Sequence, residues 1–79
     1  MELVVYTRRE CELCHEMELV IGEVLPRFSG TLKRVEIDGD ADLEAQFGLE
    51  VPVLFVNGRK AFKYRCTARE LRKRLEREK

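Results

Sequence analysis

The sequence contains no tryptophan, only two prolines and only three cysteines among its 79 residues. Three cysteines are too few for the disulfide scaffold of a small secreted domain, and an odd number leaves one unpaired. No apolar run approaches the roughly 20 residues of a transmembrane helix, and no basic segment followed by a long apolar stretch indicates a secretory signal. We therefore expect a cytoplasmic protein that does not interact with membranes, whose closely spaced cysteines serve redox or metal chemistry.

The composition suits one compact domain rather than a disordered chain, because 44% of the residues are apolar and 38% are charged. A chain of this length can build a modest core and has no room for a second one. We expect a single domain over residues 1–79, acting as a monomer.

The net charge is zero, but the two signs are distributed unevenly. Residues 1–58 hold five basic and twelve acidic side chains, whereas residues 59–79 hold ten basic and three acidic ones. A basic C-terminal region suits an anionic partner such as nucleic acid. However, no aromatic residue follows Tyr64 to stack on bases, and pairs such as Glu70 and Arg74 have the spacing of ion pairs on a helix. We therefore expect a solvated terminal helix and no nucleic-acid binding.

Two of the cysteines, Cys11 and Cys14, form a C-x-x-C motif between the apolar run at residues 3–6 and an amphipathic stretch that begins at Leu13. A motif at such a strand-to-helix junction puts one thiol at a helix N-terminus, where unpaired N–H groups and the helix dipole favour the thiolate. The second thiol lies one turn along the same face, within reach of a mixed disulfide formed by the first. The motif therefore predicts thiol–disulfide exchange.

The two thiols are expected to have different roles. Cys11 is the candidate nucleophile, because it lies at the helix start and is the more exposed. Arg8 and Arg9 precede it and favour its thiolate, whereas the glutamates on either side oppose that effect. Cys14, shielded by the first helical turn, is the candidate resolving thiol.

Other interpretations of the cysteines remain open. The pair could be two buried helical residues without a role, or belong to a non-enzymatic binding module. Cys11, Cys14, His15 and Cys66 could also ligate zinc, although structural zinc sites usually bring two short-spaced ligand pairs. His15 adjoins Cys14 and is a minor candidate for catalysis. Cys66 is expected to be a small buried side chain, with a regulatory thiol as the less favoured alternative.

The hydrophobic pattern predicts strands at residues 2–6, 32–37, 53–56 and 59–65, and helices at residues 11–25, at 41–47 and from 68 onward. Asp40 and Thr67 are candidate N-caps, and Asn57-Gly58 is a strong hairpin signal. Gly48 is expected to end a helix in the left-handed conformation, with Leu49 packed back on that helix. These elements form a βαβ unit and a ββα unit, which together predict an α/β domain with a four-stranded mixed sheet and helices on both faces.

Several segments resemble glutaredoxins. Tyr6-Thr7-Arg8 followed by Cys11-Glu12-Leu13-Cys14 is similar to the glutaredoxin active-site entry, and residues 51–58 are similar to the Val-Pro-x-x-Phe-x-Asn-Gly segment. Phe47-Gly48-Leu49 is similar to the triplet that precedes the proline in thioredoxin-like proteins. The resemblance implies a minimal thioredoxin fold, β-α-β-(α)-β-β-α, and a cis bond between Val51 and Pro52. It also implies that Arg8 and the Val51 backbone support the site.

The resemblance implies a thiol–disulfide oxidoreductase that carries no bound cofactor or metal. Its substrate would be a disulfide-containing protein or a low-molecular-weight disulfide, and its reductant either glutathione or a thioredoxin-reductase-type NADPH flavoenzyme. The chain departs from glutaredoxins in two places. Glu12-Leu13 replaces Pro-Tyr between the cysteines, and residues 62–67 lack the Gly-Gly and acidic residue that hold glutathione. We therefore expect weak glutathione binding and thioredoxin-like behaviour.

Overall fold

The computed structural model describes residues 1–78, and their strands and helices follow the expected order. The first unit consists of β1 (Glu2–Thr7), α1 (Glu12–Val24) and β2 (Thr31–Glu36). The second unit consists of β3 (Val53–Val56), β4 (Arg59–Lys63) and α3 (Ala68–Glu76), and α2 (Ala41–Phe47) connects the two units. The helix expected at residues 11–25 ends one residue earlier, and a 3-10 turn at Leu25–Phe28 follows it. No helix among residues 1–78 is long and apolar enough to cross a membrane.

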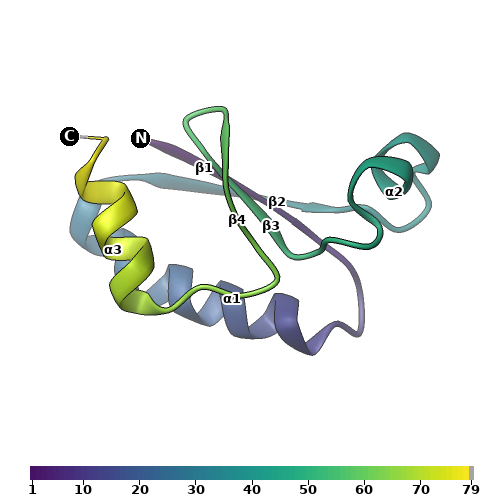
Figure 1. Cartoon of the computed structure of the whole chain (residues 1–79), viewed down its shortest axis with the longest axis horizontal. Coiled ribbons are helices and arrows are strands. Elements are labelled where there is room, and N and C mark those ends of the chain that lie inside the picture. Colours follow the sequence, from purple (N-terminus) through teal and green to yellow (C-terminus); the bar gives the residue numbers. More distant parts are fainter. Residues whose placement is uncertain (79) are drawn as a thin grey trace.

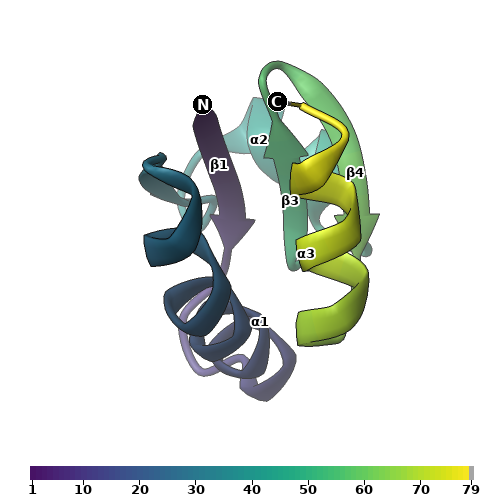
Figure 2. The same cartoon turned by 90° about the vertical axis from the view of Figure 1, so that its left-hand side faces the viewer.

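The four strands form one mixed sheet in the order β2-β1-β3-β4. Strands β1 and β2 are parallel, and the pairs β1–β3 and β3–β4 are antiparallel. Helices α1 and α3 lie side by side on one face of this sheet, and α2 lies beyond the end of β1 (Figures 1 and 2). This arrangement is the predicted βαβ unit joined to a ββα unit.

Two clusters of buried side chains hold the helices on the sheet. The larger lies between the sheet and the pair α1 and α3, and includes Leu3, Ile21, Leu54 and Leu71. The smaller lies under α2, where Ile37, Phe47 and Val53 are buried and the rings of Tyr6 and Phe47 stack with centroids 4.4 Å apart. The larger cluster fixes α1, and with it the cysteines, against the central strands.

Most of the predicted local signals are confirmed. The Asp40 side chain accepts a hydrogen bond from the Leu43 N–H and caps α2, while Thr67 and Glu70 form a reciprocal capping box at α3. Asn57 and Gly58 both have positive φ, as a two-residue hairpin of the expected kind requires.

The prediction for the end of α2 is wrong. Gly48 has φ −53°, in the right-handed region, and the Leu49 side chain is 93% exposed instead of packing back on the helix. Glycine is needed at position 48 for a different reason: a Cβ there would lie 2.5 Å from the Glu44 carbonyl oxygen and 3.1 Å from the Arg8 guanidinium. The exposed Leu49 therefore does not anchor the segment that leaves the helix, which is held instead by Val51, packed against the smaller cluster, and by the buried Pro52.

Candidate active site

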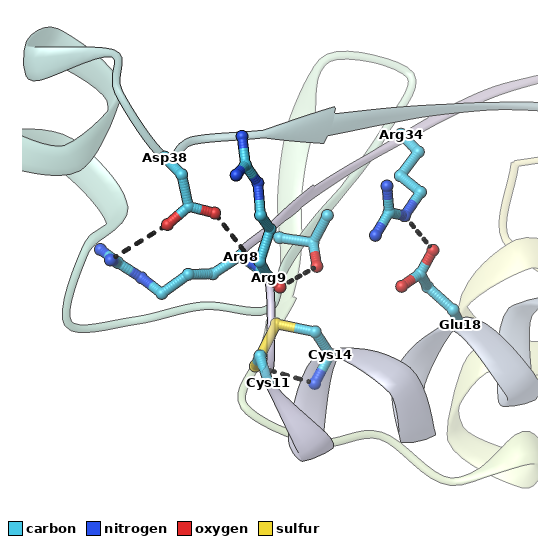
Figure 3. Close-up of a disulfide and its surroundings, with 8 residues drawn as sticks. Arg8, Arg9, Cys11, Cys14, Glu18, Arg34 and Asp38 are labelled. Carbon is cyan, nitrogen blue, oxygen red and sulfur yellow. Dashed lines mark hydrogen bonds and ion pairs between the residues drawn. A yellow bond between two sulfur atoms is a disulfide. The ribbon is translucent and has the colours of Figure 1, made fainter.

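A disulfide between Cys11 and Cys14 lies at the N-terminus of α1 (Figure 3). Cys11 is the N-cap residue of this helix, with extended backbone angles, and its Sγ accepts a hydrogen bond from the Cys14 N–H at 3.1 Å. A sulfur in this position meets one of the N–H groups that the first helical turn leaves without a backbone partner. The same N–H group would stabilise a thiolate at Cys11 after reduction.

The two sulfurs differ in exposure. Cys14 is only 1% exposed and lies with Met17 and Ile21 on the buried side of α1, whereas Cys11 is partly exposed. An incoming molecule therefore reaches Cys11 before Cys14, as the sequence predicts.

An open hollow of about 850 Å³ adjoins the disulfide, and its lining is rich in charge. Both cysteines and the exposed His15 border it. Three arginines contribute to it, namely Arg8, Arg9 and Arg34, against five carboxylates, from Glu10, Glu12, Glu16, Glu18 and Glu36. The surroundings of Cys11 therefore carry an excess of negative charge.

Arg8, which the sequence places in support of Cys11, is held elsewhere by carboxylates. Its guanidinium lies 3.5 Å from both the Asp38 and the Glu44 carboxylates, and Figure 3 shows it extending away from the disulfide toward α2. Asp38 also accepts a hydrogen bond from the Arg9 N–H at 2.8 Å. Asp38 thus fixes the loop before Cys11 to the loop after β2. This contact joins residues 29 positions apart, and no sequence motif predicts it.

A second group of ion pairs lies among the residues that line the hollow. The Arg34 guanidinium contacts Glu36 at 2.8 Å and Glu18 at 2.6 Å, and Arg9 contacts Glu36 at 3.3 Å. Hydrogen bonds from Arg34, and then from Arg9, lower the pKa of Glu36, while Glu36 and Glu18 raise the pKa of Arg34. Arg34 and Glu36 therefore stay charged at neutral pH, and the pair of Arg34 with Glu18 ties β2 to α1.

The Val51–Pro52 bond is cis, as the resemblance implies, and two backbone hydrogen bonds hold the loop that contains it. The Val51 N–H donates to the Phe47 carbonyl at 3.1 Å, and the Pro52 carbonyl accepts from the Tyr64 N–H at 2.8 Å. Among the described residues the Val51 carbonyl has no hydrogen-bond partner, so the carbonyl is the part of the Val51 backbone that remains available to a ligand.

Tyr64 contributes more to this loop than its sequence context indicates. Its hydroxyl donates to the Leu49 carbonyl at 3.0 Å, and its backbone has φ +68°, a conformation that L-residues other than Asn and Asp rarely adopt. This conformation ends β4 at Lys63, two residues before the predicted limit. Tyr64 therefore connects the end of β4 to the proline loop.

A smaller hollow of about 200 Å³ lies between α1 and the segment that leads into α3. Leu13, Met17 and Tyr64 border it together with Cys66, the free cysteine, which is buried as predicted. Burial raises the pKa of the Cys66 thiol from 9.0 to about 11, and the Glu70 carboxylate adds to this rise.

This raised pKa predicts a pH effect on stability. A thiol whose pKa is higher in the folded than in the unfolded state contributes stability below pH 9, and this contribution is lost as the pH rises toward 11. Oxidised protein, in which Cys66 is the thiol that titrates, should lose more unfolding free energy between these pH values than oxidised Cys66→Ala. Urea unfolding of both proteins measures the difference, because their other titrations cancel. Equal pH slopes would contradict the raised pKa.

The zinc interpretation receives no support from the arrangement of ligands. Within residues 1–78, no group of three or more His, Cys, Asp or Glu side chains is placed to hold a metal ion. Cys11 and Cys14 are instead joined to each other.

The sheet order, the helix positions and the C-x-x-C disulfide together define a thioredoxin-fold domain. A profile of the family described as Glutaredoxin-like domain (DUF836) matches residues 2–76. The chain therefore belongs to this glutaredoxin-like family.

Solved structures agree with this assignment. Protein XcR50 from X. campestris is 34% identical, with 95% of this chain and 96% of that chain covered and a TM-score of 0.83. Protein Ne2328 from Nitrosomonas europaea is 32% identical, with 89% of this chain and 85% of that chain covered and a TM-score of 0.74. Thioredoxin 1 from Thermosipho africanus shares the fold at 16% identity, with 99% and 93% covered and a TM-score of 0.71. No curated protein matches the chain significantly.

Proposed function

We propose that this protein is a thiol–disulfide oxidoreductase that reduces disulfides through a dithiol cycle at Cys11 and Cys14. The observation that supports this proposal is the asymmetric placement of the two sulfurs. One is partly exposed and accepts an N–H hydrogen bond at a helix N-terminus, and the other is buried beside it. This is the placement that an attacking thiol and a resolving thiol require.

The cycle conserves atoms and electrons. The Cys11 thiolate attacks one sulfur of a substrate disulfide, which forms a mixed disulfide and expels the other sulfur as a thiolate that takes a proton from solvent. Cys14 then loses its proton and attacks the Cys11 sulfur, so that the reduced substrate leaves and the Cys11–Cys14 disulfide forms. An external dithiol, or two thiols, must supply two electrons to reduce this disulfide.

We also propose that the electron donor is a thioredoxin-reductase-type flavoenzyme rather than glutathione, and that the protein works in the cytoplasm. The negative surroundings of Cys11 and the engagement of Arg8 by Asp38 and Glu44 support the first point. The buried, unpaired Cys66 fits a reducing compartment, where thiols remain free.

An insulin reduction assay tests the proposed activity. The wild-type protein should speed the precipitation of insulin chains by dithiothreitol well beyond the rate with dithiothreitol alone, because the exposed Cys11 at the helix N-terminus attacks disulfides and Cys14 then resolves the mixed disulfide. Cys66→Ala should match the wild type in this assay. No acceleration, either with dithiothreitol or with thioredoxin reductase and NADPH, would favour a binding module whose cysteines do not cycle.

A further inference from the structure

A second charged hollow lies between β4 and α3, and its charge is opposite to that of the hollow at the disulfide. It measures about 630 Å³ and shares no lining residue with the hollow beside Cys11. Five cations border it, and Glu70 is its one carboxylate. We call this hollow the basic groove, and its cations are Arg59, Lys60, Lys73, Arg74 and Arg77.

The cations of the basic groove are only partly neutralised from within the chain. Lys60 pairs with Glu50, and Arg74 pairs with Glu78 at 2.6 Å. Among residues 1–78, the side chains of Lys73 and Arg77 have no hydrogen-bond or ion-pair partner. Lys73 lies on α3, and Arg77 is its C-cap residue, one helical turn later. Glu70 offsets only part of this charge, because it is the one carboxylate on the lining of a groove with five cations. The groove therefore presents uncompensated positive charge.

Strand β4 provides the second feature of this site, because it is the last strand of the sheet. It pairs with β3 on one side, and no other strand of the described chain lies along its outer edge (Figure 2). The N–H and C=O groups of such an edge can pair with an extended segment of another protein.

The side chains of β4 place cations on both faces of this edge. Arg59 and Phe62 lie opposite Val56 and Leu54, so they share the face covered by α3. Lys60 and Lys63 lie opposite Phe55 and Val53, whose side chains face the other way. The register of β4 shifts between the Leu54 and Phe55 pairs, so Arg59 and Phe62 share a face although they are three residues apart. An added strand would therefore meet positive charge with either set of its alternating side chains. Lysines on an edge strand also oppose edge-to-edge aggregation, but that role does not explain the unpaired cations of α3.

We propose that the basic groove binds an acidic, extended segment of a partner protein, which adds to the outer edge of β4. The carboxylates of this segment would contact Arg59, Lys73 and Arg77 on one face. A single nucleic-acid strand fits less well, because the one aromatic residue of the groove, Phe62, is half-buried against the core and offers no free ring for base stacking. The inference does not depend on the redox activity of the cysteines.

Fluorescence anisotropy with a labelled peptide of about ten residues, alternating glutamate with valine or threonine, tests the proposal. We expect the peptide to bind, and to bind more weakly as salt rises from about 50 to about 300 mM. Lys73→Glu/Arg77→Glu should weaken binding on the order of tenfold, as expected when two surface ion pairs become repulsions. The matched control Arg27→Glu/Lys33→Glu makes the same charge change at exposed positions outside the groove and should bind like the wild type.

Two further measurements decide between contact modes. The NMR signals of the Ala61 and Phe62 backbone amides should shift when the peptide binds. A peptide of equal charge with prolines at alternate positions should bind weakly, because proline has no N–H group to pair along a strand edge. Equal binding of the two peptides would overturn strand addition. Equal binding by Lys73→Glu/Arg77→Glu and its control would show that the peptide does not bind in the basic groove. Tighter binding of oligothymidine than of the peptide would identify a nucleic-acid surface instead. Lys73→Gln/Arg77→Gln repeats the test if the Glu variant fails to fold.

Discussion

Replacement of Cys11 by serine is expected to abolish disulfide reduction, with a loss on the order of 10³-fold or more, as when other catalytic nucleophiles are removed. The reason is that Cys14 is buried and cannot reach a substrate disulfide by itself. Replacement of Cys14 should leave the first attack intact and stop the cycle at the mixed disulfide.

A trapping experiment separates the two roles. Cys14→Ser or Cys14→Ala, mixed with an oxidised substrate protein, should accumulate a covalent complex that is visible on a non-reducing gel and is released by dithiothreitol. Cys11→Ser should form no complex. A complex that forms through Cys14 in the Cys11→Ser protein would reverse the proposed roles.

The structure also indicates which variants test chemistry rather than folding. Serine at position 11 keeps an oxygen that can accept the Cys14 N–H, and serine is a favoured N-cap residue, so reduced Cys11→Ser should unfold like the reduced wild type. Alanine at position 11 removes the cap and should cost about 1 kcal/mol. At position 14 alanine is the safer choice, because the serine hydroxyl would be buried without a partner at a cost of about 1–3 kcal/mol.

The features that the sequence predicts well depend on neighbouring residues. The cap at Thr67 and the hairpin at Asn57-Gly58 need only a few adjacent side chains, and both are present in the structure. The burial of Cys14 follows from its position on the apolar face of one helix. The order of the strands in the sheet does not follow from the element pattern, which is compatible with other orders, and only the resemblance to glutaredoxins implies it.

The features that the sequence does not predict depend on distant residues. The position of Arg8 is decided by Asp38 and Glu44, which α2 and its preceding loop bring to it only after folding. The hydroxyl of Tyr64 reaches Leu49, 15 positions earlier, because β4 ends beside the proline loop. Local patterns contain no information on such contacts, and these contacts determine which groups around the disulfide remain free for a ligand.

The choice of electron donor depends on these contacts. Glutathione carries two carboxylates and one ammonium group, so it is a net anion at neutral pH and requires donors and cations to replace its hydration. The hollow at the disulfide holds five carboxylates against three arginines, each of which is paired with a carboxylate. At the start of α3 the N–H groups of Thr67 and Glu70 are used within the capping box. We therefore expect this site to bind glutathione poorly.

We accordingly expect excess glutathione to reduce the Cys11–Cys14 disulfide slowly, and thioredoxin reductase with NADPH to reduce it rapidly. The glutathione rate should rise with ionic strength, because salt screens the repulsion between the anion and the carboxylates. Glu10→Gln and Glu12→Gln should each raise this rate about twofold, since a charge at about 8 Å in water contributes about 0.5 kcal/mol. Glu23→Gln is the matched control, because Glu23 is exposed on the same helix outside the hollow and its replacement should leave the rate unchanged. Rapid reduction by glutathione with no response to the reductase would show that the carboxylates and Tyr64 do not exclude the tripeptide.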